Sequence, residues 1–391
     1  MKKLAIIGAS YLQRPLVEKA LEMNVESHVF AWKEGCVVDG IADFYYPISI
    51  RDKSKILEIC KQINIDGITS IASDIAMPTV NYVAEQLGLI GNSRSATVKT
   101  TDKFVMRTAL RKAGLSCPNC LVYDEANFPE DRMINYPVVV KPNDRSGSRG
   151  VQVVKKPGKV NMAIEKALSY SLSGRAIVEE FIKGKEYSVE MISYQGEHHL
   201  LAVTDKVTTG PPHFVELEHH QPADISTGME RKMAVEVIQA LNILGLENGA
   251  SHSEIFVTPN DEVIIGEIAG RMGGDLIGSD LVPYSTGYDF LKAVIEIALG
   301  EFKTGFPSVL MKEFSGAYFV SANPGIVTDI INRSGEYKEV VKAIPIVKRG
   351  QSVDGIIENS ANRAGVIVYK SPDHRVPLCP SSVLKFITRK N

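Results

Sequence analysis

Two glutamates in the segment HSEIFVTPNDEVIIGE, residues 252–267, have the spacing of a paired carboxylate site. The triplet Pro-Asn-Asp separates two runs rich in β-formers, so the segment predicts a β-hairpin. A turn centred within that triplet places Glu254 opposite Glu267 on one face. Like charges in that position destabilise a sheet. The oxygens of two carboxylates in this position suit a hard divalent cation as ligands. The alternative is an exposed pair whose repulsion is screened by solvent.

A lysine followed by a glycine-containing loop occurs in VVVKPNDRSGSRGV, residues 138–151. One apolar run ends in Lys141 and a second begins at Val151, so the pattern predicts a strand, a loop and a strand. Gly147 and Gly150 let the backbone approach a phosphate and point its N–H groups at the oxygens. The chain lacks the P-loop pattern G-x-x-x-x-G-K-[ST]. If a nucleotide binds here, a β-hairpin lid holds its phosphates.

The loop after the glutamate hairpin, AGRMGG at 269–274, carries an arginine between glycines. Arg271 could hold a carboxylate or a developing oxyanion through bidentate hydrogen bonds. Gly273 and Gly274 would give a substrate close access to the backbone. A surface arginine in a glycine loop is the alternative.

The segment IVEEFIKGKEYSVE, residues 177–190, predicts two strands joined by a Lys-Gly turn. Main-chain groups of Glu180 and Ile182 could read an adenine edge, and Glu186 could accept hydrogen bonds from ribose hydroxyls. Charged residues at such a turn are more often simply solvated. Lys103, in the first turn of a predicted helix, is either solvated or a second phosphate contact, with the anion near the helix N-terminus.

A long polar segment at 204–222 contains Lys206, Glu216 and three histidines. Its prolines argue against regular structure, and such loops often border a site. Glu216 and His220 are therefore candidate substrate contacts. A histidine-rich metal site is the weaker alternative, because the spacing fits no zinc pattern.

The positions of these residues depend on the surrounding helices and strands. The first 100 residues predict a βαβ series, which is expected to form a parallel sheet. The expected elements are strands at 4–8, 27–31 and 67–72 and helices at 14–23, 53–63 and 76–87. The turn after the first strand lacks the second and third glycines of a dinucleotide site. A Rossmann-like scaffold is therefore favoured over dinucleotide binding.

The rest of the chain predicts mixed helices and strands. A helix at 101–113 has Thr101 or Asp102 as its N-cap. Residues 138–190 form a small α+β unit. The expected strands are 121–123, 138–141, 176–180, 187–193, 316–320 and 365–369, and the further helices are 161–171, 229–244 and 289–299. Residues 301–313 form a connector.

Composition excludes several classes of protein. The chain has 391 residues, is 44% hydrophobic and carries a net charge of -2, so nothing points to nucleic acid or an anionic membrane. No apolar run approaches the about 18 residues that span a bilayer, and the expected location is the cytoplasm. The five cysteines are odd in number and scattered, which suggests reduced thiols.

Several short motifs occur in a recognisable order. They are DK at 102–103, PVVVKP at 137–142, RSGSRGV at 145–151, VEEFI at 178–182 followed by Glu186, and the Glu254–Glu267 pair. Together they resemble the ATP-grasp superfamily of carboxylate–amine ligases over roughly the first three quarters of the chain. Segment 248–278 is most similar to the branch that contains L-amino acid ligases. Residues 1–100 resemble the pre-grasp domain, as in biotin carboxylase.

This resemblance implies a fold with α/β and α+β parts. It implies a Rossmann-like pre-ATP-grasp domain at 1–100, an ATP-grasp domain at 101–308 with a lid subdomain at about 138–193, and a small C-terminal α+β domain at 309–391. The implied activity is ATP-dependent formation of an amide or peptide bond between a small carboxylic acid and a small amine, through an acylphosphate. The alternatives are an enzyme of the purine-pathway or biotin carboxylase type that uses formate or bicarbonate, or a degenerate nucleotide-binding protein. A homodimer is left open.

The resemblance also implies roles for individual residues. Arg271 and Lys141 would be catalytic. The residues that would hold ATP are Lys103, Lys141, Ser146, Gly147, Ser148, Gly150, Glu179, Glu180, Phe181, Ile182 and Glu186. Glu254 and Glu267 would hold Mg²⁺, with Mn²⁺ as an alternative. Many family members have Asn where this chain has Ala269, which leaves the number of metal ions open.

Overall fold

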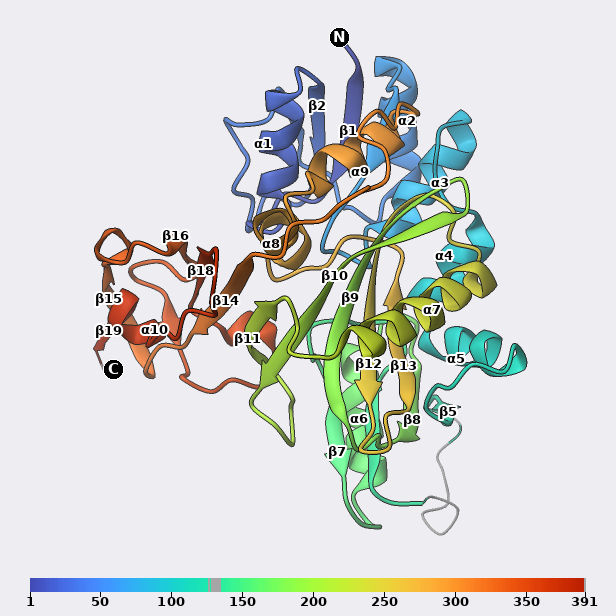
Figure 1. Cartoon of the computed structure of the whole chain (residues 1–391), viewed down its shortest axis with the longest axis vertical. Helices are drawn as coiled ribbons and strands as arrows, with labels where there is room; N and C mark the ends of the chain where they lie inside the picture. The colour runs from blue at the N-terminus through green and yellow to red at the C-terminus, as the bar shows by residue number, and fades with distance from the viewer. Residues whose placement is uncertain (126, 128–134, 390–391) are drawn as a thin grey trace.

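The computed structural model describes residues 1–125, 127 and 135–389 (Figure 1). The N-terminal part is a parallel sheet in the order β3-β2-β1-β4. Its elements are β1 (Lys3–Ile7), α1 (Arg14–Glu22), β2 (Glu26–Phe30), β3 (Phe44–Tyr46), α2 (Lys53–Ile63), β4 (Gly67–Thr69) and α3 (Met77–Leu87). The predicted βαβ series is therefore confirmed. The short, partly exposed β3 was not predicted, because three residues carry too little periodicity.

Two short helices lead from this sheet into the middle of the chain. They are α4 (Arg94–Thr101) and α5 (Lys103–Lys112). Asp102 is the N-cap of α5, since its carboxylate accepts a hydrogen bond from the Val105 N–H at 2.9 Å.

A second, antiparallel sheet has the order β5-β8-β6-β7. It consists of β5 (Cys120–Tyr123), β6 (Val138–Pro142), β7 (Gln152–Val154) and β8 (Ala176–Glu180), with α6 (Val160–Tyr170) packed against it. This unit lies at the bottom of Figure 1. The strand expected at 187–193 does not belong to it, because that strand pairs with the largest sheet instead.

The largest sheet has eight strands in the order β13-β12-β9-β10-β11-β14-β18-β16. Its strands are β9 (Lys185–Tyr194), β10 (Glu197–Thr208), β11 (Glu216–Gln221), β12 (Gly249–Val257), β13 (Val263–Ala269), β14 (Phe314–Val320), β16 (Val340–Pro345) and β18 (Gly365–Ser371). Helix α7 (Thr227–Leu244) covers one face with a buried stripe that includes Met233, Val237 and Leu241. The spacing of these residues matches one face of an α-helix.

The expectation of an irregular loop at 204–222 was wrong for most of its length. Strands β10 and β11 cover its two ends, and only residues 209–215 connect them. Of the prolines that argued against regular structure, Pro211 and Pro212 lie in that connection, and Pro222 follows the end of β11. The polar side chains on the two strands are instead paired inside the protein, as described below.

The C-terminal part is joined to this sheet rather than set apart from it. Strand β14 pairs with β11, and β18 and β16 extend the sheet to its edge. A three-stranded sheet, β17 (Ser352–Val353), β15 (Gly325–Asn332) and β19 (Leu384–Arg389), lies beside them. The remaining helical elements are η2 (Ile277–Leu281), α8 (Val282–Thr286), α9 (Phe290–Ala298), η3 (Ser334–Glu336), η4 (Ser360–Asn362) and α10 (Pro380–Val383).

No helix within the described residues is both long and apolar enough to cross a bilayer. The five cysteines are all free. Cys117 and Cys120 are partly or fully buried, and burial raises the pKa of both thiols. This environment agrees with a packing role rather than a reactive one.

Candidate active site

The glutamate hairpin has the predicted register. Strands β12 and β13 are antiparallel, and Glu254 lies directly opposite Glu267. A bulge follows Glu254, so the turn-side half of the hairpin is shifted by one residue. Each carboxylate contacts a different buried lysine, which compensates the repulsion expected between like charges.

Lys206 is the buried cation beside Glu254. Its Nζ donates to Glu254 at 3.0 Å and to Glu186, and it lies 3.6 Å from Glu216. We call these four residues the Lys206 cluster. Burial alone would lower the lysine pKa, but the three carboxylates raise it well above its usual value. The same lysine holds the Glu254 pKa below its usual range. Lys206 therefore stays charged, and the sequence pattern gave no sign of this central position.

Lys103 is the buried cation beside Glu267. Its Nζ donates to Glu267 at 2.7 Å and to the Arg145 carbonyl at 2.9 Å. Lys103 therefore connects the loop at 145–150, which we call the lid loop, to the hairpin. The side chain is only 6% exposed. The alternative of a merely solvated lysine is therefore wrong.

The helix N-terminus beside Lys103 is not free for an anion. The Lys103 N–H donates to the Asn143 carbonyl at 3.1 Å, and the Phe104 N–H donates to the Asn143 side chain at 3.0 Å. The Val105 N–H is taken by Asp102. The expectation that an anion would lie at these N–H groups does not hold in this structure, because each already has an acceptor.

Lys141, at the end of β6, contacts Glu179 on the neighbouring strand β8. Glu179 also accepts a hydrogen bond from Arg107 of α5 at 3.1 Å. Burial would raise the Glu179 pKa, but the charges of Lys141 and Arg107 lower it. Glu179 is only 5% exposed, so in this structure its carboxylate positions Lys141. Arg107 was missed, since nothing in a helical sequence distinguishes a buried arginine from an exposed one.

The loop between β6 and β7 contacts three other parts of the chain. Gly147 and Gly150 have φ of +71° and +72°, and a side chain at position 150 would press against Tyr170 and Pro142. The Gly147 carbonyl accepts a hydrogen bond from the Ser360 N–H at 3.3 Å. Ser148 Oγ donates to the Phe214 carbonyl at 3.4 Å, and Ser146 lies beside Asp74. The lid loop thus touches the C-terminal region, the connection between β10 and β11, and the loop before α3.

The four remaining candidates for nucleoside contact lie near the lid. Glu180 is exposed, and its carboxylate accepts a hydrogen bond from the Asn119 side chain at 3.0 Å. Phe181 and Ile182 are half-buried, and the Phe181 ring lies 6.2 Å from that of Phe214. Glu186 faces Lys206. Main-chain groups at 180 and 182 remain a prediction for adenine contact.

Arg271 forms a bidentate pair with Asp74, which lies in the loop before α3. Its Nε and Nη2 donate to the two carboxylate oxygens, each at 2.9 Å, and its Nη1 donates to the Met272 carbonyl at 3.1 Å. Burial alone would raise the Asp74 pKa, but Arg271 lowers it. The arginine fork predicted to hold a substrate carboxylate is therefore occupied by a protein carboxylate.

The glycines beyond Arg271 pack against a buried pair, Glu190 and His252. The Gly273 N–H donates to Glu190 at 3.0 Å, and Glu190 also contacts His252. A Cβ at Gly273 would lie 2.6 Å from Glu190 Oε1, whereas a Cβ at Gly274 would meet only Ala72 at 3.6 Å. Gly273 is thus required for this close approach, and Gly274 is not.

Gly273→Ala is expected to lower the free energy of unfolding by about 1–3 kcal/mol, because overpacking displaces the loop or the Glu190–His252 pair. Gly274→Ala is the matched control, with an expected change within about 0.5 kcal/mol. Urea unfolding of both variants measures the difference. Equal stability of the two variants would contradict the close packing at Gly273.

The two polar candidates on β11 lie on different faces. Glu216 belongs to the Lys206 cluster and also accepts a hydrogen bond from Ser360 Oγ at 3.2 Å. His220 contacts Tyr369 and Glu218 on the other side of the sheet, so the structure does not bring it to the site. His219 pairs with Lys206 across the strands and faces the site instead. A shift of one residue in the strand register would exchange the two histidines between the face of the site and the opposite face of the sheet.

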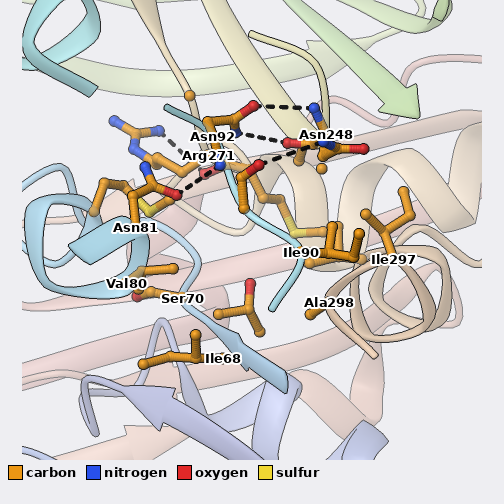
Figure 2. Close-up of a pocket in the computed structure, with 18 residues that line it drawn as sticks. Ile68, Ser70, Val80, Asn81, Ile90, Asn92, Asn248, Arg271, Ile297 and Ala298 are labelled. Atoms are coloured by element: carbon orange, nitrogen blue, oxygen red, sulfur yellow. Dashed lines mark hydrogen bonds between the residues drawn. The ribbon is translucent and has the colours of Figure 1, made fainter. Parts of the chain in front are cut away.

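A cavity of about 310 Å³ opens beside Lys103 and Glu267. Its volume is at the lower end of small-molecule pockets. A second cavity, of about 40 Å³, lies behind Arg271 between apolar side chains and a cluster of Asn81, Asn92 and Asn248 (Figure 2). The asparagines hydrogen-bond to one another and to the main chain. That space suits one or two waters but no substrate.

The site offers two carboxylates, those of Glu254 and Glu267, to a divalent cation. Among the described residues no group of three or more His, Cys, Asp or Glu lies close enough to hold a metal. Mg²⁺ commonly takes one or two protein carboxylates and completes its shell with phosphate oxygens and water. Glu254 and Glu267 fit that arrangement. Ala269, opposite His252, contributes no ligand.

The domain model for ATP-grasp domains matches residues 134–280, which include the lid and the glutamate hairpin. The chain contains an ATP-grasp domain. Its overall fold is the mixed α/β ATP-grasp fold, with the parallel sheet at 3–69 preceding the domain. The resemblance seen in the ordered motifs is thereby confirmed.

Some relatives of this chain are named as ligases. It is 28% identical over 270 residues to alanine–anticapsin ligase of Bacillus subtilis, which covers 60% of this chain and 57% of the relative. It therefore spans little more than half the length of that curated relative. The fold is similar to the L-amino acid ligase of Bacillus licheniformis, with a TM-score of 0.84, 22% identity and coverage of 100% and 99%.

A third similar structure comes from the carboxylase branch. It is the biotin carboxylase domain dimer of Hydrogenobacter thermophilus 2-oxoglutarate carboxylase, in complex with MgADP, ADP and bicarbonate. The TM-score is 0.76 at 15% identity, with coverage of 95% and 86%. At this identity the likeness concerns the fold of the ATP-grasp chain.

Proposed function

We propose that the chain is an ATP-dependent ligase that joins a small carboxylic acid to a small amine. The observation that carries the proposal is the Glu254–Glu267 pair, with Lys103 and Lys206 against it and the lid loop fixed to Lys103. This arrangement places two carboxylates that could bind a metal opposite each other in the hairpin, with a buried lysine beside each. Relatives named as ligases support the same reaction class.

The proposed reaction has two steps. A carboxylate oxygen of the acid attacks the γ-phosphorus of ATP, the bond to the bridging oxygen breaks, and ADP leaves. The amine nitrogen then attacks the acyl carbon, inorganic phosphate leaves, and a proton is released to solvent. No residue forms a covalent intermediate. The product is an amide.

The protein contributes position and charge. Lys141, held by Glu179, and Lys103, held by Glu267, would neutralise the phosphate oxygens during transfer. Magnesium bound by Glu254 and Glu267 would neutralise charge that develops on the transferring phosphoryl group. Arg271 orients Asp74, so we assign it a positioning role. Closure of the lid loop at 145–150 would exclude water from the acylphosphate.

Several finer features remain predictions. They are the domain divisions at residues 100 and 308, the main-chain contact with adenine, a cytoplasmic location and a homodimer.

ADP release from ATP and magnesium tests the function directly. We expect release to be stimulated by a carboxylic acid and an amine supplied together from an amino acid library, with the amide detected by mass spectrometry. Bicarbonate and formate arms distinguish the carboxylase-type and purine-pathway alternatives. Nucleotide binding without turnover on any acceptor would instead indicate a degenerate binding protein.

A further inference from the structure

The cavity beside the Lys103–Glu267 pair has an unusual wall. It contains four cationic side chains, Arg51, Lys53, Lys103 and Arg145, and three carboxylates, Asp74, Asp144 and Glu267. Its other residues are mainly small or apolar, such as Ile75, Pro78 and Thr79. The cavity is bounded by the N-terminal part of the chain, α4 and the lid, and it ends at the hairpin carboxylate.

Each carboxylate of the wall is already occupied. Glu267 forms an ion pair with Lys103, and Asp74 forms an ion pair with Arg271. Asp144 accepts hydrogen bonds from the N–H groups of Leu172 and Ser173 at 3.1 and 2.6 Å. Glu267 and Asp74 are thus neutralised by Lys103 and Arg271, whereas Asp144 keeps its negative charge against the three other cations of the wall.

Three of the four cations have no such partner. Within the part of the chain that the structure describes, Arg51, Lys53 and Arg145 form no ion pair with a carboxylate. Among the described residues, the buried Nε of Arg145 has no hydrogen-bond acceptor, and the exposed Lys53 side chain lies only over the Tyr82 ring, at 5.8 Å. Arg51 and Lys53 are solvent-exposed, so it is the field of several cations on one concave wall that attracts an anionic group to the cavity.

We propose that this cavity binds the acid substrate and that the substrate carries a second anionic group. This inference rests on the proposed function. The reacting carboxylate lies at the Lys103 end, where phosphoryl transfer is proposed. The second group, a carboxylate or a phosphate, pairs with Arg51 and Lys53. The preferred acids are thus dicarboxylic or phosphorylated, and neutral amino acids are poor substrates for activation.

Calorimetric titration with succinate, glutamate and O-phosphoserine tests binding without turnover, and alanine and glutamine are the neutral comparisons. We expect the anionic probes to bind about tenfold or more tightly than the neutral ones. Arg51→Met and Lys53→Met together should weaken the anionic probes by about tenfold or more and leave ATP binding unchanged. Lys55→Met is the matched control, because Lys55 is an exposed lysine on the same helix as Lys53 but does not line the cavity. The carboxylate and phosphate probes identify which anion is preferred.

The same probes in the ADP-release assay separate the two proposals. Anion binding that depends on Arg51 and Lys53, without ADP release for any acid, would overturn the ligase function and keep the cavity assignment. ADP release with alanine or glutamine that is equal to that with glutamate and O-phosphoserine, and insensitive to both substitutions, would overturn the cavity assignment and keep the function. A higher KM for the anionic acid in the double variant, with kcat unchanged, supports both.

Discussion

Replacing Glu267 by glutamine is expected to lower ATP turnover by about 100-fold or more. The amide keeps the shape of the side chain but removes one of the two negative charges offered to a divalent cation. It also removes the partner of Lys103, which would then be a buried cation without its carboxylate. We therefore expect both the rate and the magnesium dependence of ATP binding to change.

Two measurements check this expectation. Steady-state ADP release gives the loss in kcat, and titration of ATP with and without magnesium gives the loss in metal-dependent affinity. Glu262→Gln is the matched control, since Glu262 is an exposed glutamate in the same hairpin. If Glu267→Gln binds ATP and magnesium as tightly as wild type and retains full turnover, the carboxylate pair has no part in the reaction.

Replacing Lys206 by methionine is expected to lower the free energy of unfolding by about 3–5 kcal/mol at pH 7.5. The lysine side chain is only 3% exposed and is the shared cation of Glu186, Glu216 and Glu254. Without it, three carboxylates would face one another in a poorly hydrated site. Methionine preserves most of the volume, so the loss reports the charge rather than a cavity.

The pH dependence has a definite sign. In wild type the Glu254 pKa lies below its usual value, so its contribution to stability is present near neutrality and is lost as pH falls through the folded pKa. In the variant, burial and repulsion would raise the glutamate pKa values, and protonation at lower pH would relieve the repulsion. The stability difference between the two proteins should therefore be smaller at pH 5 than at pH 7.5.

Chemical unfolding at the two pH values measures this difference. Lys185→Met is the control, because Lys185 is half exposed and its partner Asp205 also contacts Arg375. That substitution should cost about 1 kcal/mol or less. A Lys206→Met protein as stable as wild type at pH 7.5 would show that the three carboxylates need no shared cation.

Local patterns predicted the hairpin well and the pairings of Arg271 and Lys206 poorly. The register that brings Glu254 to Glu267 depends on the turn, on the two-residue period of strands and on the bulge after Glu254, and only the first two are visible within 16 residues. Asp74, by contrast, is separated from Arg271 by 197 positions in sequence. No short pattern reports such a contact. Lys206 was hidden for a related reason, since its partners come from three other strands.

The choice between His219 and His220 shows a further limit. Both lie in a polar run that resembled a loop because a glycine and two prolines stand nearby. Those residues occupy only the connection between β10 and β11, and the strands on either side place alternate residues on opposite faces. Because the sequence did not show where β11 begins, it could not show which of the two histidines faces the site.

The pairing of β14 with β11 has a practical consequence for shortened chains. A chain that ended near residue 308 would lose strands β14, β18 and β16 of the largest sheet. It would leave the main-chain N–H and C=O groups of Glu218–Gln221 without their β14 partners. An uncovered edge of this kind is a template for pairing between molecules, and aggregation is the usual result. The domain boundary that the resemblance implies at this position is therefore a poor place to cut. A shortened protein that keeps the eight-stranded sheet must extend at least through β18.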